Sequence, residues 1–154
     1  MSLELLNARG ELSHFRSVVL DFNGTLALDG KLLPGVLERL KKLKELASVY
    51  VLTADTFGTS EAALGPVGIE IRVIREGRDK ASFVSELGRA ETIVIGNGRN
   101  DLPMFKVAGL SIGILGPEGM AGELAGASSI VVAKIEDALD LLLNSKRVKA
   151  TLRS

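Results

Sequence analysis

The 154-residue sequence contains no cysteine and a single histidine, His14. The lack of cysteine excludes a disulfide framework, a thiolate metal site and a cysteine nucleophile. His14 precedes any clear core element, so we expect it to be structural or solvated. One histidine also gives little support to Ser-His-Asp catalysis or to a metal site built from several histidines.

The sequence also lacks a charge excess and a long apolar run. Its 19 basic residues balance its 19 acidic residues, so no global field argues for a nucleic-acid partner or an anionic membrane surface. The N-terminus lacks the basic region and apolar run of a signal peptide, and no apolar stretch approaches the roughly 20 residues of a spanning helix. We expect a soluble, cytoplasmic protein with no nucleic-acid and no membrane partner.

What the sequence does contain is a regular alternation of apolar runs and helical patterns. Strands that alternate with helices predict an α/β fold: one Rossmann-like, doubly wound and mostly parallel sheet with helices on both faces. The length and the 46% hydrophobic content predict a single domain over residues 1–154. The expected strands are Val18 to Leu20, Val49 to Leu52, Ile69 to Ile74, Thr92 to Ile95, Leu110 to Leu115 and Ser129 to Val132.

The helices between these strands carry start and stop signals. Pro34 suits the first turn of a helix whose apolar residues recur at helical spacing through Leu46. A helix over Lys80 to Leu87 is expected to end at Gly88 in a left-handed cap. Two more helices are predicted, one opening at Asp101-Leu102-Pro103 and the last over Glu136 to Leu143.

Both ends of the chain are harder to interpret. Residues 1–16 form an amphipathic lead-in that is expected either to cover a sheet edge or to pair as a hairpin around residues 7–10. The basic tail over residues 145–154 is expected to be a solvated last turn; contact with a phosphate-rich partner is the alternative. The glycine series at 113, 116, 119 and 122 lacks the pattern of a P-loop or a dinucleotide fingerprint, so a glycine-rich turn beside the site is expected.

Polar residues follow several of the predicted strands, at the edge where a doubly wound sheet holds its ligand. Each of them alone is an ordinary cap, turn or surface residue. Together they form an ordered set of a carboxylate, a hydroxyl, an ammonium and a glycine-rich acidic loop. They are Asp21, Thr53 with Asp55, Lys80, and Gly96-Asn97-Gly98-Arg99-Asn100-Asp101.

These residues resemble the motifs of the haloacid-dehalogenase-like phosphotransferase superfamily. The first motif, Asp-x-Asp-Gly-Thr, is matched by residues 21–25, and the last, Gly-Asp-Gly-x-Asn-Asp, by residues 96–101. Thr53 matches the second-motif threonine and Lys80 the third-motif lysine. The resemblance is strongest to the soluble P-type-ATPase-like branch, because Asn23 stands where most phosphatases have an acid. It covers residues 17–143.

The resemblance implies a role for each matched residue. Asp21, Asn23 and Lys80 would be catalytic, with Asp21 attacking phosphorus to form an aspartyl phosphate. Thr53, Lys80 and Gly24 would bind the phosphoryl oxygens. Mg²⁺ is the implied cofactor, held by Asp21, the main-chain carbonyl of Asn23, and Asn97, with Asp101 as a further metal-site residue that orients the loop or a metal-bound water. Asp55 and Asn100 are possible neighbours of these residues, which they would hold in place without contacting the metal or the phosphate themselves.

Two departures from the family pattern limit the expected activity. Asn23 replaces the acid that protonates an alkoxide leaving group and later activates water, a role whose loss costs about 10²- to 10⁴-fold in rate. Asn97 replaces a carboxylate that would contact Mg²⁺ directly. We therefore expect a phosphohydrolase or phosphotransferase that is weak on alkyl phosphate monoesters. The alternative is a non-catalytic phosphate-binding or regulatory module that keeps the fold.

The gaps between the motifs leave no room for a cap domain. The segment from Leu26 to Leu33 holds only a small hairpin turning at Leu28-Asp29-Gly30, and the gap between the second and third motifs holds one short helix and a strand. The site is therefore expected to be open. It would admit a phosphorylated small molecule or a protein phosphosite, or a homo-oligomer would supply the cap.

Overall fold

The computed structural model describes residues 1–55 and 58–154 and has a central sheet of six strands, in the order β10-β9-β8-β3-β6-β7. All five strand pairs are parallel, as the apolar runs predict. The strands are β3 (Ser17–Asp21), β6 (Ser48–Thr53), β7 (Glu70–Val73), β8 (Thr92–Gly96), β9 (Leu110–Ile114) and β10 (Ile130–Val132).

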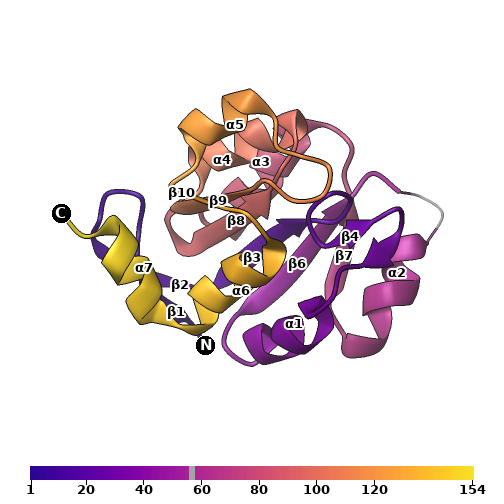
Figure 1. Cartoon of the computed structure of the whole chain (residues 1–154), viewed down its shortest axis with the longest axis horizontal. Helices are drawn as coiled ribbons and strands as arrows, with labels where there is room; N and C mark the ends of the chain where they lie inside the picture. Colours follow the sequence, from indigo (N-terminus) through magenta and orange to yellow (C-terminus); the bar gives the residue numbers. More distant parts are fainter. Residues whose placement is uncertain (56–57) are drawn as a thin grey trace.

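Helices cover both faces of this sheet, as Figure 1 shows. One face carries α1 (Val36–Lys44), α2 (Thr59–Leu64) and α6 (Ile135–Leu143). The other carries α3 (Gly77–Leu87), α4 (Leu102–Val107) and α5 (Gly122–Ala127). Alternation along the strands divides the core accordingly: Val18 and Leu20 belong to the first buried cluster, while Val19 packs with Phe83 and Met104 in the second.

The strand order places a topological switch point beside β3. From β3 the chain adds β6 and β7 on one side, then crosses to add β8, β9 and β10 on the other. Loops diverge at such a point, so the carboxyl ends of β3 and β8 border a crevice. Asp21 is the last residue of β3 and therefore stands at that crevice.

Most of the predicted helix boundaries hold, but α3 begins at Gly77 instead of Lys80, and three further details differ. Pro34 precedes α1, because Gly35 takes a left-handed conformation, φ 79°, and the helix begins at Val36. The helix ends at Lys44, so Leu46 lies outside it and is 41% exposed. Gly88 does end α3 with a positive φ of 107°, but its ψ of 107° is not that of a left-handed cap.

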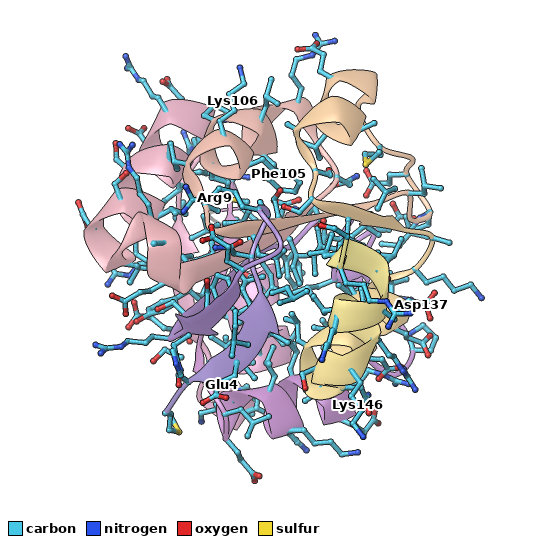
Figure 2. All side chains as sticks on the ribbon, turned by 90° about the vertical axis from the view of Figure 1, so that its left-hand side faces the viewer. Glu4, Arg9, Phe105, Lys106, Asp137 and Lys146 are labelled. Carbon is cyan, nitrogen blue, oxygen red and sulfur yellow. The ribbon has the colours of Figure 1, made fainter. Side chains whose placement is uncertain are left out.

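The lead-in forms the predicted hairpin, β1 (Leu3–Leu6) with β2 (Leu12–Phe15), and its Leu3, Leu5 and Phe15 enter the core. The basic side chains of the tail are solvated, as predicted, but the tail forms a helix of its own, α7 (Ser145–Leu152), and not a last turn. Val148 is buried on this helix and Leu152 packs beside it, so a stripe at i and i+4 covers β1. Figure 2 looks onto this end of the molecule, where Lys146 lies on the outer side of α7.

Short segments fill the two gaps in which related folds carry caps. The first holds the hairpin β4 (Ala27–Leu28) and β5 (Lys31–Leu32), whose turn places Asp29 and Gly30 at φ 51° and 82°. The second holds α2, the 3-10 turn η1 (Gly65–Val67) and β7 among its described residues. Two more 3-10 turns are η2 (Arg89–Glu91) and η3 (Arg99–Asp101). The described part of the chain therefore contains no inserted cap domain, and none of its helices is long and apolar enough to cross a bilayer.

Candidate active site

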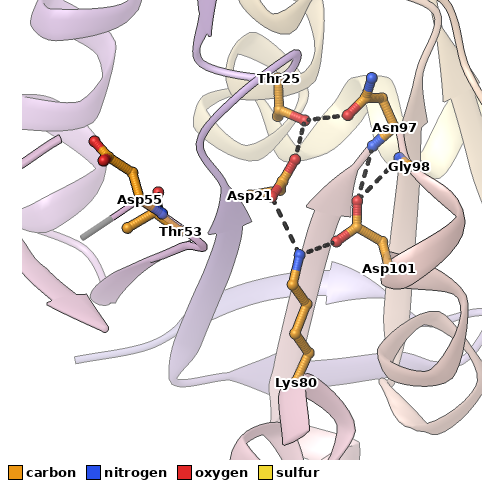
Figure 3. Close-up of polar contacts among 8 residues, drawn as sticks. All are labelled: Asp21, Thr25, Thr53, Asp55, Lys80, Asn97, Gly98 and Asp101. Carbon is orange, nitrogen blue, oxygen red and sulfur yellow. Dashed lines mark hydrogen bonds and ion pairs between the residues drawn. The ribbon is translucent and has the colours of Figure 1, made fainter. Parts of the chain in front are cut away.

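The polar cluster at the switch point is centred on Asp21 (Figure 3). Its Oδ1 lies 3.2 Å from Lys80 Nζ, and its Oδ2 lies 3.4 Å from the hydroxyl of Thr25. The side chain retains 14% of its exposure, so one edge of the carboxylate faces solvent while the rest is enclosed. An Asp at the end of a buried strand is thus both held in place and accessible to a ligand.

Lys80 reaches this carboxylate from α3, on the face of the sheet that also carries α4 and α5. Its side chain is 2% exposed, and its ammonium lies between Asp21 and Asp101, with Nζ 2.7 Å from Asp101 Oδ1. Burial lowers the pKa of Lys80, but the two carboxylates outweigh it, so the pKa lies above its usual range. Lys80 is therefore a fixed positive charge beside Asp21.

Asp101 is completely buried and holds the loop that follows β8. Its Oδ2 accepts hydrogen bonds from the main-chain amides of Asn97 and Gly98, both at 3.1 Å, while its Oδ1 accepts from Lys80. A Cβ at position 96 would collide with this carboxylate, so the close approach of Asp101 requires glycine there. Because both oxygens of Asp101 are occupied within the protein, the arrangement favours its loop-orienting role over direct metal contact.

Asn97 presents its amide oxygen to the hydroxyl of Thr25, which also contacts Asp21 (Figure 3). Its Nδ2 donates to the carbonyl of Gly119 at 2.9 Å, which orients the amide, and its Oδ1 lies 3.2 Å from Thr25 Oγ1. Thr25, fully buried, shares its one hydroxyl hydrogen between Asn97 and Asp21. Thr25 is a site residue to which no role was assigned from the sequence. Its position as the last residue of the first motif could have indicated that it lies at the site.

The environment of Asp21 shifts its protonation. Burial raises the pKa most, the nearby Asp101 carboxylate raises it further, and Lys80 and Thr25 lower it, so that the pKa lies at about 7. An ordinary aspartate has a pKa of about 3.9. Around neutral pH the metal-free protein therefore holds Asp21 as a mixture of acid and carboxylate.

Asn23 and Gly24 form the loop in front of Asp21. Asn23 is exposed, and its main chain bridges to Ala27. Gly24 has φ 80°, and a Cβ there would lie 2.7 Å from Asn97 Nδ2, so the loop needs glycine at this point. Among the described residues, no hydrogen bond or ion pair joins the Asn23 side chain to the rest of the cluster.

Thr53 and Asp55 lie at the end of β6, to one side of the cluster in Figure 3. Thr53 is buried, and its hydroxyl accepts a hydrogen bond from the Asp55 amide at 3.0 Å. Asp55 Oδ2 in turn accepts from the amide of Thr59, the first residue of α2. These hydrogen bonds link the end of β6 to the start of α2. Asn100, which was also expected near the site, is exposed.

The donor set at the site suits a hard cation but carries little charge. Within residues 1–55 and 58–154, no three His, Cys, Asp or Glu side chains are grouped as a metal site. The carboxylate of Asp21 and the amide oxygen of Asn97 are nevertheless linked through Thr25, and oxygen ligands of this kind fit Mg²⁺. The residues therefore fit a magnesium site with one carboxylate fewer than the family pattern.

A hollow of about 470 Å³ adjoins the site loops. It is lined by Leu33 and Pro34, by Gly116 and Pro117, and by residues 133–136. Gly116 lines the hollow and also lies against the first-motif loop, because a Cβ on it would lie 3.0 Å from the carbonyl oxygen of Gly24. The predicted glycine-rich turn is thus confirmed to lie against the first-motif loop.

Residues 3–109 match the family model of haloacid dehalogenase-like hydrolases. Two uncharacterized proteins of Methanocaldococcus jannaschii are similar: one is 52% identical over 61 residues, 40% of this chain and 66% of that protein. The other is 59% identical over 39 residues, 25% of this chain and 89% of that protein. The first match thus spans just under two thirds of its relative.

Solved phosphatase structures share the fold. The 3-deoxy-D-manno-octulosonate 8-phosphate phosphatase of Moraxella catarrhalis, in complex with magnesium, phosphate and sugar, is 16% identical with a TM-score of 0.67, covering 88% of this chain and 90% of that one. The cobalt-bound enzyme from Haemophilus influenzae is 18% identical with a TM-score of 0.65, covering 91% and 94%. An apo phosphoserine phosphatase is 16% identical with a TM-score of 0.65, covering 84% and 98%. At these identities the likeness concerns the fold.

Proposed function

The chain belongs to the haloacid dehalogenase-like hydrolase family, and from this premise we propose that it is a phosphohydrolase or phosphotransferase acting through Asp21. The observation that carries the proposal is the placement of the Asp21 carboxylate at the switch point, 3.2 Å from the buried ammonium of Lys80. An enclosed carboxylate with one accessible edge and a fixed cation beside it is suited to attack an anionic phosphoryl group.

The protein's own residues divide the work of the first step. A carboxylate oxygen of Asp21 attacks phosphorus, and the bond from phosphorus to the leaving group breaks, with the electron pair going to the leaving group. Lys80 offsets the repulsion between the carboxylate and the phosphoryl oxygens. Thr53 and the main chain at Gly24 are the proposed phosphoryl ligands. Asp101 keeps Lys80 and the loop over Asn97 and Gly98 in position.

Mg²⁺ is the proposed cofactor. Asp21, the carbonyl oxygen of Asn23 and the amide oxygen of Asn97 would hold it, and when bound it supplies charge neutralisation of the phosphoryl oxygens. Asn97 brings no charge of its own, so the intrinsic affinity of these three ligands should be lower than that of a site with two carboxylates.

Asn23 restricts the leaving groups that the site can release. Because an amide donates no proton to an alkoxide, we propose weak activity on alkyl phosphate monoesters. Acyl phosphates and phosphoanhydrides release a carboxylate or a phosphate, and these leaving groups depart as stable anions that need no proton. The resemblance to the soluble P-type-ATPase-like branch supports this preference, since that branch also lacks an acid at this place.

The described residues contain no cap over the site, so substrates of different sizes could reach it. We propose a phosphorylated small molecule or a protein phosphosite as substrate, with a homo-oligomer as the means of covering the site. The hollow beside Gly116, which borders the first-motif loop, offers room for part of a substrate.

A phosphate-binding or regulatory module is the second candidate. It is favoured by one observation, the absence of a three-acid metal cluster among residues 1–55 and 58–154. Such a module would keep the fold and the positive charge of Lys80, and would bind phosphate without forming a covalent bond to Asp21.

Labelling with acetyl phosphate and Mg²⁺ distinguishes the two candidates. Attack by Asp21 transfers the phosphoryl group and releases acetate, so intact-mass analysis should show the gain of one phosphoryl group. Asp21→Asn should abolish the adduct, whereas Asp137→Asn, an exposed acid on α6, should retain it. Phosphate binding without an adduct, and indifferent to Asp21→Asn, would instead support the module.

A further inference from the structure

Glu118 lies beside the candidate active site, although no sequence motif includes it. It belongs to the loop between β9 and α5. A Cβ placed on Gly24 would lie 3.0 Å from Glu118 Oε2 and 3.1 Å from Asn97 Oδ1. The carboxylate of Glu118 and the amide of Asn97 therefore stand side by side over the same glycine.

The protein holds this loop against the site on both sides of Glu118. After it, the carbonyl of Gly119 accepts from Asn97 Nδ2 at 2.9 Å, and the amide of Ala121 donates to the Asn97 carbonyl at 2.8 Å. Before it, Gly116 packs against the Gly24 carbonyl. The position of Glu118 is thus set by main-chain contacts to the same residues that form the metal site.

The carboxylate of Glu118 has no cation partner in the part of the chain that the structure describes. Glu123, five residues later, differs because its Oε1 pairs with Arg99 at 2.9 Å. An exposed carboxylate on a loop held next to the uncharged side chain of Asn97 is available to a cation arriving from solvent.

We propose that Glu118 is a further metal-binding residue of this site, supplying the negative charge that Asn97 lacks, through a ligand oxygen or a bridging water. The inference rests on the proposed function, because it concerns the same Mg²⁺. With Lys80 offsetting one of the two carboxylates of Asp21 and Asp101, the cluster carries at most one net negative charge. Glu118 adds a second and restores the attraction for a divalent cation.

The test is the affinity of the purified protein for Mg²⁺, measured by isothermal titration calorimetry without substrate. Glu118→Gln keeps the size of the side chain and removes its charge, and it should weaken Mg²⁺ binding about 10- to 100-fold. Glu123→Gln removes the same charge from the same segment and should leave the affinity unchanged. Because Glu118 is exposed, the metal-free unfolding temperature should be the same in all three proteins.

A second pair of variants tests whether the charge of Glu118 substitutes for the one missing at Asn97. Asn97→Asp restores a carboxylate there, so Glu118→Gln in that background should cost much less affinity than in the natural sequence. An equal loss in both backgrounds would contradict the proposed substitution.

The two proposals fail in different ways. If the natural protein binds Mg²⁺ and Glu118→Gln binds it equally well, the role of Glu118 is overturned while the proposed function stands. If Glu118→Gln lowers the metal-free unfolding temperature, Glu118 is structural and the inference is overturned as well. If the natural protein binds no Mg²⁺, both the role of Glu118 and the magnesium-dependent activity are overturned.

Discussion

The ammonium of Lys80 lies 2.7 Å from the buried carboxylate of Asp101, closer than the 3.2 Å that separates it from Asp21. The lysine beside Asp21 is therefore anchored by a second acid that faces no solvent. Asp101 in turn holds two main-chain amides of the loop after β8. Charge and loop geometry at the site thus depend on a single ion pair.

Removing Lys80 should destabilise the whole protein as well as the site. Lys80→Met leaves two enclosed carboxylates facing each other without a counter-charge, which costs about 3 to 5 kcal/mol for a broken buried pair. Urea denaturation at pH 8, where Asp21 is mostly ionised, would measure the loss in the free energy of unfolding.

Arg16 offers the matched control, because it pairs with Glu91 at 2.9 Å with side chains that are 74% and 46% exposed. Arg16→Met should cost less than about 1 kcal/mol, as for most exposed ion pairs. If the two variants lost equal stability, burial of the Lys80 pair would not be the cause.

The raised pKa of Asp21 predicts how stability depends on pH in the metal-free protein. The folded pKa of about 7 exceeds that of an unfolded aspartate, about 3.9, so unfolding releases a proton between these values. The contribution of Asp21 to stability is therefore fully present below pH 4, declines as the pH rises and is lost above pH 7.

Asp21→Asn removes this titration and isolates its effect. The difference in unfolding free energy between Asp21→Asn and the natural protein, measured in EDTA from pH 4 to pH 8, should shift steadily in favour of the variant until about pH 7 and then level off. A difference that stayed flat across this window would show that Asp21 has an ordinary pKa.

Gly96 should tolerate no side chain, because a Cβ there meets the carboxylate of Asp101. Gly96→Ala should force Asp101 away from Lys80 and the loop amides, with a loss of about 1 to 3 kcal/mol from overpacking. Gly126 is the comparison: it lies in α5 with nothing within 4 Å of a Cβ. Gly126→Ala should stabilise the protein by about 0.5 to 1 kcal/mol. Thermal unfolding of both variants would reveal the opposite signs.

The sequence predicted the sheet well because its central strands are buried on both faces, so that each of these is a nearly continuous apolar run such as Val18 to Leu20. It failed at α7, where three charged residues obscured a stripe of only two apolar ones, Val148 and Leu152. Helix formation there depends on packing against β1, which no local pattern reveals.

The site was predictable only where a motif residue ends a strand or opens a helix. Asp21 and the loop that contains Asp101 follow β3 and β8, which are neighbouring parallel strands, so they lie at the same edge of the sheet as expected. The contacts of Thr25 and Glu118 depend on how closely loops pass one another at Gly24 and Gly116, and glycine spacing does not encode that distance. The pairing of Lys80 with Asp101 likewise depends on how α3 lies against α4.

An acid at position 23 should raise the rate of the proposed reaction on alkyl phosphate monoesters. Asn23 is exposed, so Asn23→Asp should fold normally. The new carboxyl group would protonate an alkoxide leaving group and then activate water against the aspartyl phosphate, which should raise kcat on an alkyl phosphate monoester by about 10²- to 10⁴-fold. Steady-state assays with Mg²⁺ would measure this rise, and acetyl phosphate labelling should show a shorter-lived adduct. Asn144→Asp adds the same charge at an exposed position outside the site and should change neither quantity, whereas an equal rise in both variants would mean that charge alone is responsible.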